Sequence, residues 1–491
     1  MADRSRAGIE MNFAFGKTKR PKPEPSEDAP FRMLVLGDFG AHRSRGQVRP
    51  GAELRPLRVD VDSFPSLFGR IGAQIAIRLG DQPAFTIAIK ELDDFHPDHL
   101  FAALEFFAPL RKLRQQIQDP KTFALAAAQL GMAAAPAASV VTGQGTSDDE
   151  DVSRLLGRPS SAAKPVAPSP SPASIVDAMI RESVAPHIVG KPDPRQADLL
   201  AAVDGMAGDL MRAVLHDPVF QEVEATWRSL DRLVRALDLD ETLQLFVLDA
   251  SREEMVEDLA ASPTLADSAL YRIVADHAGD EPWSLLVDLH ACRRGQEDAA
   301  LLSRLGAIAQ QVDAAVLVGM EWAGWSGGFA ALDDEQAWTA LRNLPAATSV
   351  AVALPGILLR LPYGKDTDPI ESFTFAEQSL SPAANRYLWG SAAAAVAQLL
   401  GQSFASAGGW DFAPGDDSSI DDLPVHVTKA DGETVQTPCA QVWLPESKVD
   451  ALIKQGLMPL VSAQGRGEVR VPRFQSIASP PAALAGRWRR D

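Results

Sequence analysis

Four apolar runs within residues 243–354 decide the fold class of this 491-residue chain. In order they read LQLFVL (243–248), SLLVDL (284–289), AAVLVG (314–319) and SVAVAL (349–354). Helical patterns are expected in the more polar stretches between them, around residues 253–260, 297–312 and 335–341. Strands that are apolar on both faces and alternate with helices are typical of a mostly parallel sheet with helices on both sides. The sequence therefore predicts a large α/β domain.

Helices are also expected just before the first of these strands. Asp217 and Pro218 have the residue types of an N-cap and a first helical turn. The residues after them repeat an apolar stripe at helical spacing: Val219, Phe220, Val223, Trp227, Leu230, Val234 and Leu237. Beyond residue 408 the pattern returns to short strand-like pieces, at 425–428, 440–444 and 468–471.

The N-terminal part of the chain predicts a smaller α+β region. Residues 31–37 (FRMLVLG) and 84–89 (AFTIAI) are strand candidates. A helix should follow, with Asp94 as its cap and Pro97 in its first turn. Its apolar stripe should continue past Pro109 with a kink there. The stripe consists of Leu100, Leu104, Phe107, Leu110, Leu113 and Ile117.

Low-complexity sequence separates the two parts. Residues 133–172 are dominated by Ala, Pro, Ser and Gly, and such a stretch buries too little apolar surface to offset its ordering entropy. We therefore predict four regions: an N-terminal extension (1–30), a small domain (31–132), a linker (133–173) and a large domain (174–491).

Composition narrows the classes of function. The net charge of −18 argues against nucleic acid or an anionic membrane as the principal partner. The two cysteines, Cys292 and Cys439, cannot form a disulfide framework, and the N-terminus lacks the apolar core of a signal peptide. The alanine-rich stretch 387–404 carries Gln398 and Gln402 and is better explained as a buried helix than as a membrane span. We expect a cytoplasmic protein without direct membrane insertion.

Signals for catalysis, cofactors or metals are weak. Residues 324–328 (GWSGG) match the nucleophile-elbow pattern around Ser326, with His426 downstream, but residues 321–324 (EWAG) stand between the strand and the serine, so the tight turn of that motif is not evident. His96 and His99 lie among aspartates, a pattern better explained by a capped helix start than by a metal site. The Gly-Lys pairs lack the glycine that a Walker motif requires. We expect no enzyme activity, no cofactor and no metal.

Several strings resemble the two subunits of the type VI secretion contractile sheath, TssB and TssC. The small-subunit resemblance rests on residues 31–39 (FRMLVLGDF), 55–64 (RPLRVDVDSF), 91–100 (ELDDFHPDHL) and 110–123 (LRKLRQQIQDPKTF). The large-subunit resemblance rests on 213–233 (AVLHDPVFQEVEATWRSLDRL), 358–364 (LLRLPYG), 368–377 (DPIESFTFAE), 387–390 (YLWG) and 456–461 (GLMPLV). The order of the strings indicates both subunits fused in one polypeptide.

This resemblance implies a structural protomer that polymerises with itself into a helical tube. The tube would surround an inner tube of hexameric rings, assemble on baseplate components, contract to propel effectors, and be recycled in some systems by a AAA+ unfoldase. Because the TssB-like part runs straight on into the linker and has no free carboxyl end, recognition by the unfoldase is a weak expectation. The alternative is a sheath-like baseplate or assembly factor that does not polymerise, and an α/β hydrolase using Ser326 is a remote one.

The family resemblance also implies strand exchange between neighbouring protomers. The candidates are short extended segments near the chain ends: Met11, Asn12, Phe13, Ala14, Phe15, Glu468, Val469, Arg470 and Val471. Ordinary edge strands within one protomer explain them equally well. Within RLPYG, Arg360 and Tyr363 are expected to hold the core of the TssC-like part. Arg360 could pair with a carboxylate, while Pro362 and Gly364 force a turn; a routine surface turn is the competing interpretation.

Overall fold

The computed structural model describes residues 29–130 except 81–82, and residues 193–488 with short gaps. The gaps are 277–280, 324–327, 330, 379–385, 413–414, 416–417 and 431–432. The chain forms two compact units: the first joins the residues up to Leu104 with those from Gly208 onward, and the second spans Glu105–Ala207. Each is described by itself.

A seven-stranded sheet forms the centre of the first unit, in the order β14-β8-β7-β6-β1-β5-β2. All neighbouring strands are parallel except β2, which runs antiparallel to β5. The strands are β1 (Phe31–Gly37), β2 (Leu57–Val59), β5 (Leu243–Asp249), β6 (Leu285–Cys292), β7 (Ala315–Met320), β8 (Val350–Leu354) and β14 (Met458–Pro459). All four strands predicted between residues 243 and 354 are confirmed, and they lie in one mostly parallel sheet.

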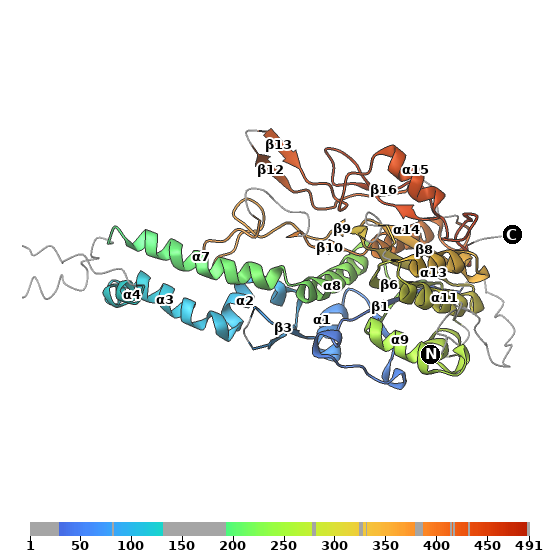
Figure 1. Cartoon of the computed structure of the whole chain (residues 1–491), viewed down its shortest axis with the longest axis horizontal. Coiled ribbons are helices and arrows are strands. Elements are labelled where there is room, and N and C mark those ends of the chain that lie inside the picture. Colours follow the sequence, from blue (N-terminus) through green and yellow to red (C-terminus); the bar gives the residue numbers. More distant parts are fainter. Residues whose placement is uncertain are drawn as a thin grey trace, which may run out of the picture. The chain divides into compact units, whose positions relative to one another are not determined.

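Helices cover both faces of the sheet (Figure 1). One face packs against α9 (Arg252–Ala261), α10 (Ala269–Tyr271), α11 (Gln296–Gln311) and α13 (Leu332–Arg342), in a single apolar core. The other packs against α8 (Pro218–Ala236) and α14 (Ala392–Ala407). The predicted cap of α8 is confirmed, since the Asp217 carboxylate accepts the N–H groups of Val219 and Phe220. The predicted α/β class, with a sheet flanked by helices, is confirmed.

Strand β1 lies in the middle of this sheet, although it belongs to the N-terminal part of the chain. Val35 on β1 is opposite Val247 of β5 on one side and Val287 of β6 on the other. The small region therefore supplies a central strand of the large sheet, which the sequence pattern did not indicate. The two parts of the chain share one core.

The rest of the small region extends from this strand. It contains α1 (Phe64–Ile71), the hairpin of β3 (Gln74–Ile77) and β4 (Phe85–Ala88), and α2 (Pro97–Ala103). The strand predicted at 84–89 is confirmed as β4. Asp94 is not the cap of α2: His96 is the N-cap and accepts the N–H of Asp98, while Asp94 accepts N–H groups of the preceding turn. Pro97 occupies the first turn as predicted.

The second unit consists of helices. Here α3 (Ala108–Gln118) and α4 (Phe123–Gln129) pack against the N-terminal part of α7 (Gln196–Leu215). Arg114 donates to Asp204 at 2.9 Å, and the Gln196 amide donates to the carbonyl of Ile117. The predicted kink at Pro109 is wrong in form. Instead of one kinked helix there are two, α2 and α3, joined by a 3-10 turn, and Pro109 lies in the first turn of α3.

Two short strands precede α14, and further short strands and one helix follow it. The C-terminal part contains β9 (Ile357–Leu358), β10 (Trp389–Gly390), β11 (Ser418–Ile420), β12 (Val427–Ala430), β13 (Glu433–Gln436), α15 (Glu446–Lys454), β15 (Val461–Ser462) and β16 (Val469–Val471). The strand predicted at 440–444 is wrong: only Ala440 makes a bridge, with Ile357, and the segment then turns toward α15. In the described part of the chain, no helix combines the length and the apolar character needed to cross a bilayer.

Candidate functional site

A cluster of buried charges in the first unit surrounds Arg360. We call Glu224, Arg228, Arg360, Tyr363 and Glu377 the Arg360 cluster. The Arg360 guanidinium donates to Glu224 Oε1 at 2.8 Å and to Glu377 Oε2 at 2.7 Å. Glu224 is fully buried and Glu377 is 1% exposed. Bidentate pairing of this kind satisfies charges that would otherwise be very costly to bury.

The other members close the Arg360 cluster. Arg228, one helical turn after Glu224 on α8, donates to the Glu224 carboxylate at 2.7 Å and to the Tyr363 hydroxyl at 3.1 Å. The backbone N–H of Tyr363 donates to Glu377 Oε2, and the Arg360 guanidinium stacks over the Tyr363 ring at 4.2 Å. Two arginines thus balance two glutamates.

Electrostatics in the Arg360 cluster follow from this arrangement. Burial alone would raise the pKa of Glu377, but the charge of Arg360, the hydrogen bonds from Arg360 and Tyr363, and the nearby His216 ring lower that pKa to about 2. Burial raises the pKa of the Tyr363 hydroxyl to about 12, against the opposing effect of Arg360. Glu377 is therefore ionised and Tyr363 neutral near pH 7, which suits a structural clamp.

A second set of buried charges joins the N-terminal segment to the large sheet. We call Asp38, His42, Arg49, Asp249 and Glu254 the junction cluster. Asp249, the last residue of β5, accepts from His42 Nε2 at 2.9 Å and from Arg49 Nη1 at 3.0 Å. Arg49 also donates to Glu254 at 2.8 Å, and Glu254 closes the capping box of α9. The junction cluster therefore fixes the loop after β1 against the end of β5.

Asp38, His42 and Asp249 place ligand atoms within 4.8 Å of one another, the spacing that a metal ion needs. The side chains of these three residues already have hydrogen-bond partners, however. Asp38 accepts the backbone N–H groups of His42 and Arg43, and Asp249 accepts from His42, Arg49 and Gly40. With an arginine bound to the same carboxylate, an ion pair network is the better account of these residues.

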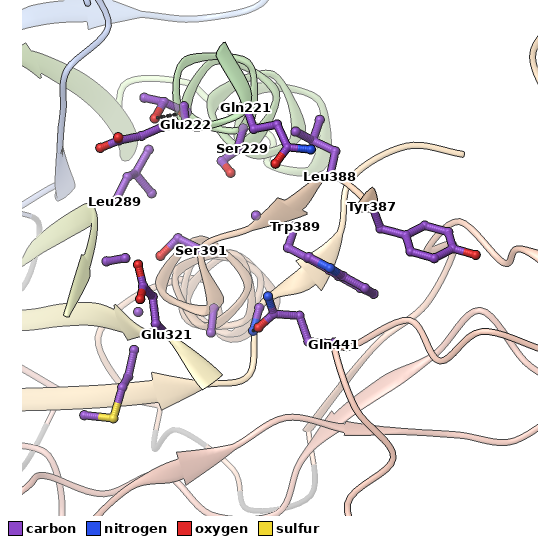
Figure 2. Close-up of a pocket in the computed structure, with 18 of the residues that line it drawn as sticks. Gln221, Glu222, Ser229, Leu289, Glu321, Tyr387, Leu388, Trp389, Ser391 and Gln441 are labelled. Carbon is purple, nitrogen blue, oxygen red and sulfur yellow. Dashed lines mark hydrogen bonds between the residues drawn. The ribbon is translucent and has the colours of Figure 1, made fainter. Parts of the chain in front are cut away.

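A pocket of about 360 Å³ opens at the carboxyl ends of β6 and β7 (Figure 2). Gln221, Glu222 and Ser229 of α8 line one side, and Ser391, the N-cap of α14, lies opposite. Gly319 at the end of β7 allows this close packing, because a Cβ there would stand 2.4 Å from Ser391 Oγ. The carboxyl ends of parallel strands are a common place for ligands in α/β folds.

Both glutamates of this pocket have an arginine partner. Glu321 pairs with Arg293 at 3.1 Å, and Glu222 pairs with Arg43 at 3.1 Å. The described residues that line the pocket include no histidine or cysteine. The pocket is large enough for a small molecule.

Of the candidate residues selected from the sequence, those around Arg360 lie in the core and those at 468–471 lie at a small antiparallel sheet. Arg360 pairs with two carboxylates in the core, Pro362, Tyr363 and Gly364 form the segment beside it, and Tyr363 and Gly364 make isolated bridges to Asp368 and Ala376. Val469–Val471 form β16, which pairs with β11 on one side and β15 on the other; Glu468 precedes it. Strand exchange through Glu468–Val471 stays a prediction.

Three predictions concern residues outside the described part of the chain. These are the strand-exchange segment from Met11 to Phe15, the linker at 133–173 and the serine of the nucleophile-elbow pattern, Ser326. His426, the histidine proposed for that serine, is described: its Nδ1 lies 2.6 Å from the Tyr387 hydroxyl.

Sequence reasoning missed Glu224, Glu377 and the whole junction cluster. One signal was available: Glu224 and Arg228 stand four residues apart inside the apolar stripe of α8, where a lone charge would be buried. Nothing local marks His42, Arg49 or Asp249, because their partners lie about 200 residues away.

Comparisons with known proteins agree with this architecture. The family model described as "EvpB/VC_A0108, tail sheath N-terminal domain" matches residues 197–321 and 329–478, more than half of the chain. The model described as "Type VI secretion system, VipA, VC_A0107 or Hcp2" matches residues 8–131. A curated relative, the "Type VI secretion system sheath protein TssC1" of Pseudomonas aeruginosa, is 26% identical over 304 residues. That match covers 57% of this chain and 61% of the relative, so the chain spans less than two thirds of the relative's length. The chain belongs to the tail sheath family of type VI secretion systems, with a VipA-like segment and a VipB-like segment in one polypeptide.

Proposed function

We propose that the chain is a structural protomer of a contractile sheath, which polymerises with itself into a helical tube in the cytoplasm. The observation that carries the proposal is the position of β1 between β5 and β6. Because the VipA-like segment supplies a central strand to the VipB-like sheet, the two segments form one folding unit with a fixed one-to-one ratio. The proposed domain limits remain 31–132 and 174–491, with 133–173 as the connection.

An inner tube of hexameric rings, baseplate components and a AAA+ unfoldase are further proposed partners. They follow from the family and not from a contact in this chain. The Arg360 cluster and the junction cluster would keep the protomer rigid, so that contraction changes the packing between protomers more than the protomer itself.

Negative-stain electron microscopy of the purified chain tests the proposal, alone and then with its inner-tube partner. Long hollow tubes of regular pitch are expected. Monomers or small rings under both conditions would contradict polymerisation and favour the second candidate, a sheath-like assembly or baseplate factor.

We further propose that the chain is not an enzyme. Replacing Ser326 with Ala should leave tube formation and thermal stability unchanged, whereas a hydrolase would lose its nucleophile. Turnover of a panel of ester substrates by the wild type, abolished in Ser326→Ala, would overturn this proposal.

A further inference from the structure

A second pocket, of about 540 Å³, lies on the face of the sheet that α9 and α10 cover. Three arginines line it, Arg32, Arg55 and Arg272, together with Phe246 and Trp283. None of the described residues that line the pocket is acidic. In a chain with a net charge of −18, this concentration of positive charge is unusual.

Arg32 is held rigidly at the back of the pocket. Its guanidinium lies 4.3 Å from the centre of the Trp283 ring and 4.8 Å from that of Phe246. It donates to the backbone carbonyl of Glu281, and the Glu281 carboxylate is 4.0 Å away on a side chain that is 57% exposed. The aromatic rings therefore fix the orientation of the cation.

Arg55 and Arg272 stand at the mouth of the pocket and are exposed. Arg55 donates to the carbonyl of Leu54, and Arg272 donates to the carbonyls of Asp267 and Ser268. Within the described residues, no carboxylate pairs with either guanidinium within 4.0 Å. Their remaining donors are oriented by these local bonds and are free to meet an acidic group from outside.

The first turn of α13 has the complementary chemistry. Leu332 is 69% exposed, the highest value among the large apolar side chains of the described residues. Asp333 and Glu335 beside it are exposed, while Asp334 is occupied by the backbone N–H of Gln296. An apolar side chain flanked by two exposed carboxylates matches a pocket with aromatic walls and cationic edges.

The pocket of Arg32, Arg55 and Arg272 and the first turn of α13 lie at opposite ends of one layer of helices. Helix α11 lies in the middle of that layer, with α13 packed on one side and α9 and the turn after α10 on the other. A contact from the α13 end of one copy to the α10 end of the next joins two different patches. Such a heterologous contact does not close on itself, and it generates rings or helical tubes.

We propose that the pocket of one copy receives the first turn of α13 of a second copy, with Asp333 and Glu335 meeting Arg55 and Arg272. This inference rests on the proposed sheath function and names one contact between its protomers. Leu332 packs against the apolar wall of the pocket, and Arg32 supplies a fixed positive charge behind it.

Charge reversal and charge exchange test the contact. The variant Arg55→Glu/Arg272→Glu should raise the protein concentration needed for tube formation by about tenfold or more, because like charges then oppose each other across the interface. Adding Asp333→Arg/Glu335→Arg to the same chain exchanges the two signs and should restore most of the assembly. The control Arg70→Glu/Arg235→Glu reverses two exposed arginines outside the pocket and should assemble as the wild type does. Sedimentation and electron microscopy measure assembly, and circular dichroism melting verifies that each variant folds.

The outcomes separate this inference from the proposed function. Wild-type tubes together with unimpaired tubes of Arg55→Glu/Arg272→Glu would overturn the contact and leave the sheath function standing. If the variant Arg55→Glu/Arg272→Glu/Asp333→Arg/Glu335→Arg folds but does not regain tube formation, the first turn of α13 is not the occupant of the pocket. If the wild type forms no tubes, both the proposed contact and the proposed sheath function are contradicted.

Discussion

Around Val35 the central sheet is surrounded by aliphatic side chains, whereas around Arg360 an equally buried region is filled with ionised groups. The two regions are stabilised differently. Burial of apolar surface is non-directional and adds up over many contacts. The Arg360 cluster depends on all its partners being present, because each charge is tolerable only while the opposite charge is bound to it. The sheet can therefore be expected to accept apolar exchanges, and the Arg360 cluster to be intolerant of single changes.

The largest effect is expected from placing a charge in the sheet. Val35→Asp puts a carboxylate between β5 and β6, where Val35 is fully buried and lies opposite Val247 and Val287. Burying an unpaired charge costs many kcal/mol, so the first unit should fail to fold. Limited proteolysis and circular dichroism would measure this. Val61→Asp, at a side chain that is 61% exposed, is the control and should fold normally.

Breaking the Arg360 cluster should come second. Arg360→Met leaves Glu224 and Glu377 buried with fewer partners, and removing one member of a buried pair typically costs about 3–5 kcal/mol. A lower apparent melting temperature is expected, with folding retained. Arg235→Met removes an arginine whose side chain is 72% exposed and should change little.

A further variant sharpens the contrast. Combining Arg360→Met with Glu224→Gln and Glu377→Gln removes the buried charges as well as the cation, so part of the lost stability should return. If Arg360→Met alone melts as the wild type does, the Arg360 cluster contributes no more than the surface pairs.

Acid should weaken the Arg360 cluster before it weakens the sheet. Glu377 has a folded pKa of about 2 against its ordinary 4.5. A depressed pKa contributes stability above about pH 4.5, and this contribution is lost as the pH falls toward about 2. Melting temperatures of the wild type should therefore fall across this window. In Glu377→Gln this component of the pH dependence should be absent; an unchanged slope would contradict the assignment.

The smallest effect is expected at the junction cluster. Burial lowers the pKa of His42, but the hydrogen bond and charge of Asp249 outweigh it and raise the pKa above 6.5. A raised pKa contributes stability below about pH 6.5 that is lost as the pH rises through the folded value. The wild type should lose a little stability from pH 6 to 8. His42→Gln should lose that dependence, and a steeper decline in this variant would argue against the pairing.

Periodicity and caps predicted most of the large domain from sequence. The strands around residues 243–354, the cap at Asp217 and the buried helix within 387–404 all depend on near neighbours in the chain. The errors arose where a local pattern had more than one solution. The stripe after Leu100 fits one kinked helix or two helices equally well, and the run at 440–444 lacks the partner strand that would make it a strand.

The site was only partly predictable. Arg360 was marked for pairing because an arginine in an apolar, turn-forming segment needs an anion, but its two partners belong to segments 136 residues before it and 17 residues after it. No sequence pattern indicated the pocket of Arg32, Arg55 and Arg272, because these residues come from separate elements that meet only in the folded chain.

The sequence by itself determined most element types and the α/β class, because these follow from spacing within each segment; the order of the TssB-like and TssC-like parts came from the resemblance of short strings to that family. Only the tertiary structure decided that β1 enters the large sheet between β5 and β6, and which carboxylates neutralise Arg360 and Arg49. The physical reason is the range of the interactions. Hydrogen-bonding periods and caps act over a few residues, whereas strand order and buried ion pairs depend on groups that the folded chain brings together from hundreds of residues apart.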